Sequence, residues 1–237
     1  MIATKVFHKM GEGPNDHSAS RQHIFDGVEN SLRRLQTDTI DLYQIHRWDA
    51  NTPLEETLRA LDDLIRAGKV RYIGASNFDG WQLTHANGLA ELKGWSKFVS
   101  VQPHYHMLER EIEKELIPAC NYFGIGILPY FPLAGGFLTG KYQEGLPIPE
   151  GSRGESSQYV QRYMTPENYA KLGKLAAFAA AYGHTLNELA HAWLLAQPMV
   201  SSVISGATKV THVESNAVAG DWDLSPEEVG IINEILA

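Results

Sequence analysis

Residues 68–78 read Gly-Lys-Val-Arg-Tyr-Ile-Gly-Ala-Ser-Asn-Phe, and this stretch decides the fold. Its centre, residues 70–75, predicts a short β-strand that ends in the polar pair Ser76 and Asn77. One helical pattern ends just before this strand, and another covers residues 80–92 after it. A strand between two helices predicts a parallel sheet, because the chain must cross back over the sheet before it forms the next parallel strand.

The same unit of strand, loop and helix recurs along the chain. We predict strands at residues 2–7, 39–46, 70–75, 98–102, 126–130 and 200–204. We predict helices at about residues 21–35, 53–67, 80–92, 109–123, 166–182, 186–196, 210–219 and 226–236. Ser20 is expected to cap the first helix, and Thr52 with Glu55 is expected to form a capping box at the second.

Two architectures fit this alternation, an open doubly wound sheet and a closed β/α barrel. A doubly wound sheet concentrates its site at one switch point, usually with a Gly-x-Gly-x-x-Gly turn, and no such motif follows any predicted strand. Functional-looking side chains instead lie at the carboxyl end of every predicted strand, which is typical of a parallel (β/α)8 TIM barrel. These residues are Lys5, His46, Ser76, Asn77, Gln102, Tyr130, Ser205 and Gly206. We therefore predict an α/β barrel.

The predicted units number six, whereas a closed barrel of this class has eight. Each unit takes about 30 residues, so two further units would give a chain of about 300 residues. We therefore expect residues 1–237 to form a single, incomplete barrel domain. Residues 2–7 would lie at an unprotected sheet edge, and such edges favour self-association.

Composition and charge exclude several classes of protein. The chain has 20 Lys and Arg against 28 Asp and Glu, a formal net charge of −8, which argues against nucleic acid as a partner. Its single cysteine, Cys120, excludes an internal disulfide and favours the cytoplasm. His104 and His106 have no third ligand at a suitable spacing, so we expect no metal site. No apolar run reaches the roughly 18 residues of a membrane span.

Four segments resemble the aldo-keto reductase superfamily, namely residues 31–49, 68–78, 130–142 and 202–216. The third reads Tyr-Phe-Pro-Leu-Ala-Gly-Gly-Phe-Leu-Thr-Gly-Lys-Tyr, and all four follow the family's order. The pattern is most similar to the bacterial branch that also includes the potassium-channel β subunits. The resemblance implies a barrel that binds NADP(H) and reduces small-molecule aldehydes or ketones to alcohols. It also implies that the chain begins at the third barrel strand, with the first two strand–helix units absent.

The resemblance assigns catalytic residues at two strand ends. Lys5 matches the family's lysine, whose ammonium would lower the pKa of the catalytic tyrosine. His46 matches the histidine that hydrogen-bonds the substrate carbonyl, and Trp48 would form a wall of the substrate pocket. The family's aspartate and tyrosine belong to the two units that have no counterpart here. We therefore expect the 237-residue chain to reduce aromatic aldehydes negligibly.

The resemblance also implies a nearly complete cofactor site. Ser76, Asn77 and Gln102 would hold the nicotinamide carboxamide, and Tyr130 would stack on the nicotinamide ring. A glycine-containing loop would cover the pyrophosphate through Phe131, Leu133, Gly135, Leu138, Gly140 and Lys141. The adenosine end would contact Gly206, Thr208, Lys209, His212, Ser215 and Asn216. Thr208 and Lys209 would bind the 2′-phosphate, which favours NADP over NAD.

Three hypotheses follow from a cofactor site without the proton donor. The first is an NADP-dependent carbonyl reductase whose N-terminal part lies outside this sequence. The second is a catalytically silent subunit that binds NADP or a partner protein. The third is an inactive fragment with exposed sheet edges. An aspartate and a tyrosine encoded in frame upstream of Met1 would favour the first hypothesis.

Overall fold

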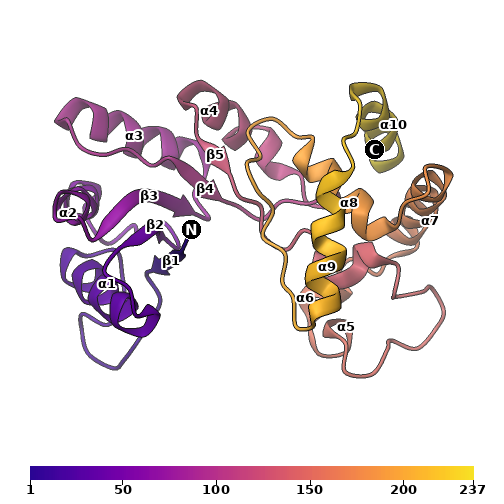
Figure 1. Cartoon of the computed structure of the whole chain (residues 1–237), viewed down its shortest axis with the longest axis horizontal. Coiled ribbons are helices and arrows are strands. Elements are labelled where there is room, and N and C mark those ends of the chain that lie inside the picture. The colour runs from indigo at the N-terminus through magenta and orange to yellow at the C-terminus, as the bar shows by residue number, and fades with distance from the viewer. The chain divides into compact units, whose positions relative to one another are not determined.

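The computed structural model describes residues 1–237, which form two compact units. The first unit comprises Met1–Pro103 and Ile112–Ile127, and the second comprises His104–Glu111 and Leu128–Ala237 (Figure 1). Each unit has its own fully buried side chains, such as Leu61 in the first and Trp193 in the second. The expectation of a single domain stays a prediction.

The first unit is built on a parallel sheet with the strand order β1-β2-β3-β4-β5. Its strands are β1 (Ala3–Val6), β2 (Ile40–Ile45), β3 (Val70–Ser76), β4 (Ser100–Gln102) and β5 (Gly126–Ile127). Neighbouring strands are also consecutive in sequence, whereas a doubly wound sheet reverses its order at a switch point. The predicted α/β fold with a parallel sheet is confirmed, and the strand order is the one that a β/α barrel has.

The register of the sheet separates a polar face from an apolar one. One row of paired residues crosses all the strands as Lys5, Gln44, Gly74, Ser100 and Gly126. The next row, Val6, Ile45, Ala75, Val101 and Ile127, is fully apolar and buried. Gly74 is required between its two polar neighbours, because a Cβ atom there would lie 2.6 Å from Ser100 Oγ. Alternation along each strand therefore keeps the polar row together on one face.

Four helices belong to the first unit, namely α1 (Arg21–Leu35), α2 (Leu54–Arg66), α3 (Gly80–Lys93) and α4 (Leu116–Phe123) (Figure 1). The bounds of α1 agree with the prediction, and the Ser20 side chain accepts a hydrogen bond from the His23 N–H as its N-cap. The apolar residues of α1 and α2, including Ile24, Val28, Leu58 and Leu61, are fully buried. These helices therefore supply the core of this unit.

The capping box predicted at Thr52 and Glu55 is wrong. Pro53 is the N-cap of α2, and no side chain caps the helix. The Thr52 hydroxyl instead donates to Asp49 at 2.7 Å, and Glu55 forms an ion pair with Lys93. The Asp49 carboxylate also accepts from the N–H groups of Ala19 and Asn51, so it draws Thr52 into the loop after β2.

The predicted helix at residues 109–123 is shorter in the structure. His106 and Glu109 exchange backbone hydrogen bonds in an antiparallel bridge, which keeps Glu109 out of a helix. A short 3-10 turn, η1 (Glu111–Glu113), follows, and α4 begins only at Leu116.

The second unit contains helices of different lengths that are joined by irregular segments. These are η2 (Ala134–Thr139), α5 (Arg153–Ser156), α6 (Gln158–Gln161), α7 (Pro166–Ala181), α8 (Leu186–Leu195), α9 (Val210–Val218), η3 (Ala219–Asp221) and α10 (Pro226–Leu236). The bounds of α10 agree with the prediction, and Ser225 and Glu228 form a capping box at its start. No helix of the chain is both long and apolar enough to cross a membrane.

The strand predicted at residues 200–204 is reduced to one parallel bridge between Ile204 and Tyr130. The strand predicted at residues 126–130 also ends early, because β5 stops at Ile127. Pro129 has no N–H to donate to a ladder, and Phe131 adopts a left-handed backbone with φ of 64°. Pairing along this stretch is therefore limited to the residue between them.

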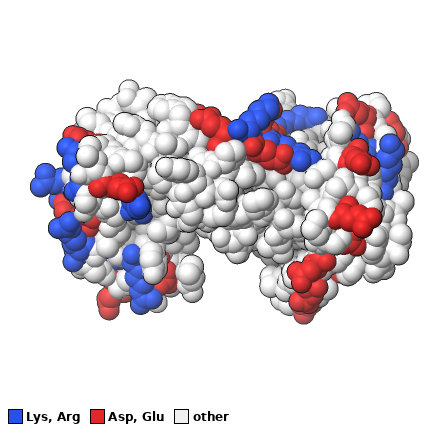
Figure 2. Space-filling view, turned by 90° about the horizontal axis from the view of Figure 1, so that it is seen from above, with Lys and Arg blue, Asp and Glu red and all other residues white.

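Charged side chains of both signs lie close together on the surface. Figure 2 shows Lys and Arg among Asp and Glu on the face seen from above, with broad uncharged areas between the clusters. Ion pairs of the chain include Arg71 with Asp41 and Lys171 with Glu167. This face carries no extended patch of positive charge.

We predict that Asn87→Ala lowers the free energy of unfolding of the first unit by about 2–4 kcal/mol. The buried Asn87 amide donates to the Phe98 carbonyl at 3.0 Å and accepts from the Phe98 N–H at 2.9 Å, just before β4 begins. Urea unfolding followed by circular dichroism measures the change. Asn51→Ala is the matched control, because Asn51 is exposed. Equal midpoints for the two variants would contradict this contribution of Asn87.

Candidate functional site

Lys5 and His46 lie at the carboxyl ends of two neighbouring strands in the first unit. Lys5 is in β1, and His46 follows β2 directly. The backbone N–H of His46 donates to the Val6 carbonyl at 2.9 Å. Both side chains are half-buried. The structure therefore brings the two predicted catalytic residues together at one edge of the sheet.

The surroundings of His46 hold its imidazole neutral. Burial is the largest cause, and the nearby His8, Lys5 and Arg47 add to it, so that the pKa of His46 falls to about 4. The His8 ring stands edge-on to the His46 ring, with 4.4 Å between the ring centroids. Burial also lowers the pKa of Lys5. At neutral pH, His46 is therefore able to donate one hydrogen bond and to accept another.

An amide cluster lies beside His46 on the same edge. The Asn77 side-chain amide donates to the His46 carbonyl at 3.0 Å and to Ser76 Oγ at 3.1 Å. The Ser76 hydroxyl donates to the Gln102 carbonyl at 2.9 Å, and the buried Gln44 amide donates to Gln102 Oε1 at 3.1 Å. The predicted carboxamide-binding residues therefore form one connected group.

Trp48 lies on the loop that follows His46. Its indole packs against Phe78 and Trp81, with 5.4 Å between ring centroids in each case. Trp48 is half-buried and Trp81 is 54% exposed, so this cluster presents an aromatic surface next to the strand ends. The assignment of Trp48 to a substrate pocket stays a prediction.

In the second unit, Tyr130 is held against His104. Their backbones form a parallel bridge, and their rings stack with 5.3 Å between centroids and an interplanar angle of 16°. Phe131 stands edge-on to His104 at 5.7 Å. Tyr130 is half-buried, as a residue that stacks on a planar ligand must be.

The loop that starts at Phe131 is a series of left-handed residues. Phe131, Gly135, Gly136 and Gly140 all have positive φ, and Leu133 caps the η2 turn. A Cβ atom on Gly135 would lie 2.3 Å from Val160 Cγ2, so only glycine fits. Leu138 is buried in the turn, whereas Lys141 is exposed, with its ammonium 4.9 Å from the Tyr142 ring. Lys141 is therefore the residue of this set that the loop presents at the surface.

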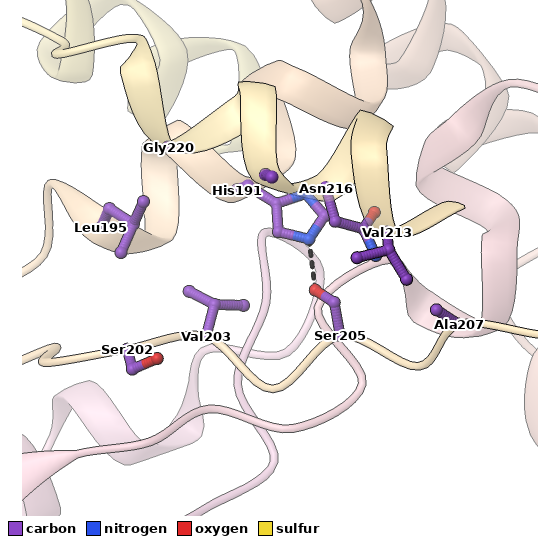
Figure 3. Close-up of a pocket in the computed structure, with 10 residues that line it drawn as sticks. His191, Leu195, Ser202, Val203, Ser205, Ala207, Val213, Asn216 and Gly220 are labelled. Carbon is purple, nitrogen blue, oxygen red and sulfur yellow. Dashed lines mark hydrogen bonds between the residues drawn. The ribbon is translucent and has the colours of Figure 1, made fainter. Parts of the chain in front are cut away.

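A pocket of about 350 Å³ lies between α8, α9 and the segment that precedes α9 (Figure 3). It is lined by His191, Leu195, Ser202, Val203, Ser205, Ala207, Val213, Asn216, Ala217 and Gly220. The His191 ring is fixed by the Asn187 carbonyl at 2.7 Å and by the Ser205 hydroxyl. Burial lowers the pKa of His191, which favours its neutral form.

Of the predicted adenosine-binding residues, only Asn216 lines this pocket. Gly206, Thr208, Lys209, His212 and Ser215 are exposed around the start of α9. Lys209 is the N-cap residue of α9, and the Thr208 N–H donates to His212 Nδ1 at 3.4 Å. The Ser215 hydroxyl is 2.8 Å from the Asn187 amide, so it is already engaged.

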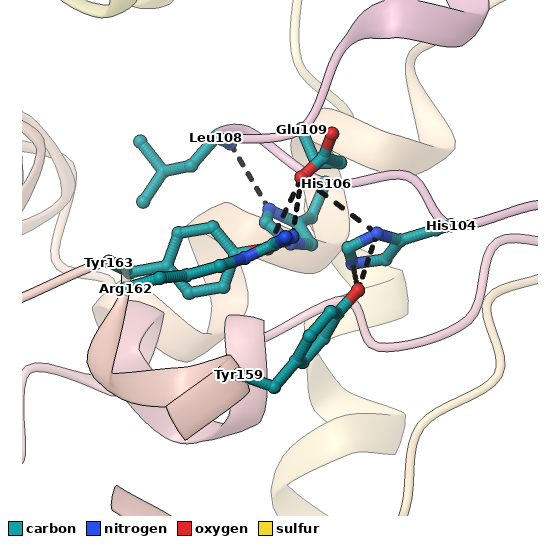
Figure 4. A network of polar contacts seen from close by, with 7 residues as sticks. All are labelled: His104, His106, Leu108, Glu109, Tyr159, Arg162 and Tyr163. Atoms are coloured by element: carbon teal, nitrogen blue, oxygen red, sulfur yellow. Dashed lines mark hydrogen bonds and ion pairs between the residues drawn. The ribbon is translucent and has the colours of Figure 1, made fainter. Parts of the chain in front are cut away.

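A network of polar contacts joins the turn at residues 104–109 to α6 and the residues after it (Figure 4). Arg162 donates to Glu109 at 2.7 Å and to the Tyr163 hydroxyl at 2.6 Å. The Tyr163 hydroxyl lies 3.2 Å from His106 Nε2. The His106 ring is fully buried, and burial lowers its pKa well below the usual value.

This network and the pair His191–Ser205 are not predictable from the sequence. The alternation of His104 and His106 is a signal, but it suggests a pair of metal ligands. No group of three His, Cys, Asp or Glu side chains in the chain is arranged to hold a metal ion. The partners of these histidines come from distant segments, so no spacing in the sequence indicates them.

We predict that Lys5→Met raises the pKa of His46, because the variant removes a positive charge that disfavours the imidazolium. Burial and His8 remain, so the pKa should stay below the usual value for histidine. Titration of the His46 Cε1–H resonance by NMR measures the shift. Lys97→Met is the control, since Lys97 pairs with Glu91 away from the strand ends. An unchanged midpoint would show that Lys5 does not act on His46.

Comparison with known proteins adds independent evidence. The sequence profile of the aldo/keto reductase family matches residues 1–237. The chain is 40% identical over 93% of its length to a probable voltage-gated potassium channel subunit beta of Arabidopsis thaliana, and it covers 68% of that protein. It is 37% identical to an aldo-keto reductase of Fusarium vanettenii (98% of the chain, 63% of that protein). It is 33% identical to the versiconal hemiacetal acetate reductase of Aspergillus parasiticus (94% and 65%).

Such relatives support carbonyl reduction as the general chemistry, and members of the family generally use NAD(P)H. The match over the whole chain agrees with the parallel α/β sheet and with the polar residues at its strand ends. The chain belongs to the aldo/keto reductase family of oxidoreductase enzymes.

Proposed function

We propose that this chain provides the cofactor-binding part of an NADP(H)-dependent oxidoreductase that reduces aldehydes or ketones to alcohols. The observation that carries the proposal is the pairing of Lys5 with a neutral His46 at adjacent strand ends, beside the amide cluster of Ser76, Asn77 and Gln102. We place the protein in the cytoplasm, where the single buried thiol, Cys120, stays reduced.

The donor set of the first unit fits a nicotinamide carboxamide. Gln102 accepts through its Oε1 atom, which leaves its NH2 group as a donor, and Ser76 Oγ is both donor and acceptor. In the second unit, the glycine loop and the exposed Lys141 suit a pyrophosphate, and Lys209 with Thr208 suits a phosphate at the start of α9. NADPH, when bound, supplies the hydride.

Each catalytic side chain would contribute through its charge state. A neutral His46 donates a hydrogen bond from its ring N–H to a carbonyl oxygen and polarises the carbonyl. The Lys5 ammonium would stabilise a neighbouring phenolate, which makes a tyrosine a better acid–base group near neutral pH. No residue of this sequence matches the family's tyrosine, so we propose that the 237-residue chain binds the cofactor but turns over negligibly.

A second candidate function is a catalytically silent subunit that binds NADP(H) or a partner protein. The names of three relatives favour it, since proteins of Arabidopsis thaliana, Oryza sativa and Schizosaccharomyces pombe are named potassium channel subunit beta. Cofactor binding without turnover fits this candidate as well as the first. Reduction of an aromatic aldehyde by the purified chain, lost in His46→Ala, would exclude it.

We also propose that copies of the chain associate through β1. This strand pairs only with β2, and the Ile2 and Val6 carbonyls accept bonds from that side. Because backbone groups alternate along a strand, those of Ala3 and Lys5 face the open edge. An open edge of this kind adds a strand from another chain.

We predict that the chain binds NADPH more tightly than NADH and that Lys209→Ala removes about 10- to 100-fold of NADPH affinity. The reason is the loss of a charge-assisted contact with the 2′-phosphate, so NADH affinity should not change. Titration by nucleotide fluorescence measures both ligands. Lys174→Ala, which removes an exposed lysine of α7, is the control. Equal affinities for NADH and NADPH in the unmodified chain would contradict the proposal.

We predict that Ala3→Pro shifts the chain from a dimer or larger assembly to a monomer in sedimentation velocity at micromolar concentration. Proline removes the Ala3 N–H from the open edge and leaves the bonds between β1 and β2 in place. Ala3→Ser keeps the N–H and should associate as the unmodified chain does. A monomeric unmodified chain, or an Ala3→Pro variant that still associates, would exclude the β1 edge as the interface.

A further inference from the structure

His104 covers one face of the Tyr130 ring. The stacking is close to parallel, with an interplanar angle of 16° and a centroid distance of 5.3 Å. The two residues also share a parallel backbone bridge, so their rings cannot slide apart along the chain. The orientation of Tyr130 therefore depends on the orientation of the imidazole behind it.

The Tyr159 hydroxyl contacts that imidazole. Its oxygen lies 2.8 Å from Nδ1 and 3.1 Å from Nε2 of His104 (Figure 4). The centroid of the Tyr159 ring is 5.2 Å from that of Phe131. The Arg162 guanidinium sits over the Tyr159 ring at 4.2 Å. Tyr159 is therefore itself held from two sides, on α6, which is 55 residues away from His104 in sequence.

The contacts behind Tyr159 and Arg162 are complete when His106 is neutral. The Leu108 N–H donates to His106 Nδ1 at 3.2 Å, so neutral His106 carries its proton on Nε2. That proton is then donated to the Tyr163 oxygen, 3.2 Å away, and Arg162 also donates to this oxygen. Glu109 accepts from Arg162 and lies 3.9 Å from His104 Nδ1. These contacts thus support the Tyr159–His104 contact from behind.

We infer that Tyr159 and His104 are positioning residues that set the plane of the Tyr130 ring for the nicotinamide end of the cofactor. This inference rests on the proposed function, in which Tyr130 stacks on the nicotinamide. With His104 on one face of Tyr130, the nicotinamide stacks on the other. Tyr159 acts through His104 and does not touch the cofactor itself. The pair therefore affects the nicotinamide end of NADPH and leaves the adenosine end unaffected.

Two ligands distinguish an effect on the nicotinamide end from an effect on the adenosine end. NADPH contains both, whereas 2′,5′-ADP contains only the adenosine end. Tyr159→Phe, which removes one hydroxyl, should weaken NADPH binding about 3- to 10-fold. His104→Ala should weaken it about 10-fold, and His104→Phe, which keeps a stacking ring, should recover most of that loss. The affinity for 2′,5′-ADP should stay the same in all three variants.

Calorimetric titration of the full chain with each ligand makes these measurements, and Tyr122→Phe is the matched control because Tyr122 is 84% exposed. Unchanged NADPH affinity in Tyr159→Phe and His104→Ala would overturn the inference and leave the proposed function standing. Equal weakening of both ligands would also overturn it, since that is the result of a structural defect. An unmodified chain that binds neither ligand would overturn the proposed function, and this inference with it.

Discussion

The parallel register of the first unit's sheet is the constraint on which the candidate site depends. Because all its strands run in the same direction, the residues that follow them arrive at one edge. Pairing of Lys5 with Gln44 and of Ser76 with Gln102 aligns the polar side chains, while the next row is buried against the helices. A slip of one residue would turn the polar row toward the core. One register therefore specifies both the packing and the site.

Elements whose signals are local were predictable from the sequence. The bounds of α1 and α10 agree with prediction, because Ser20 and Ser225 cap helices within a few residues of themselves. Thr52 carried an equally good local signal, yet its hydroxyl bonds to Asp49, which also receives the Ala19 N–H from 30 residues away. Whether such a side chain caps its helix depends on hydrogen-bond partners from distant segments. A short sequence window does not contain those segments.

The candidate site likewise contains residues that the sequence indicates and contacts that it does not. Lys5, His46 and Gln102 could be found from the sequence, because each lies at the carboxyl end of a strand whose pattern is readable. The contact between His104 and Tyr159 could not, since α6 lies in a stretch without periodicity, and only the folded chain brings the two side chains within 2.8 Å. The same holds for His191, whose ring is fixed by Ser205 across a pocket.

Two histidines with lowered pKa values differ in what they can do. His106 is fully buried, and the Leu108 N–H occupies its Nδ1, so protonation would cost both desolvation and a hydrogen bond. Neutral His106 therefore acts as a packing residue in the interior of the second unit. His46 is only half-buried, and its low pKa comes from burial together with the charges of His8 and Lys5. A half-buried imidazole that is kept neutral by its neighbours remains available to a ligand, and this separates a group that can do chemistry from one that holds the fold.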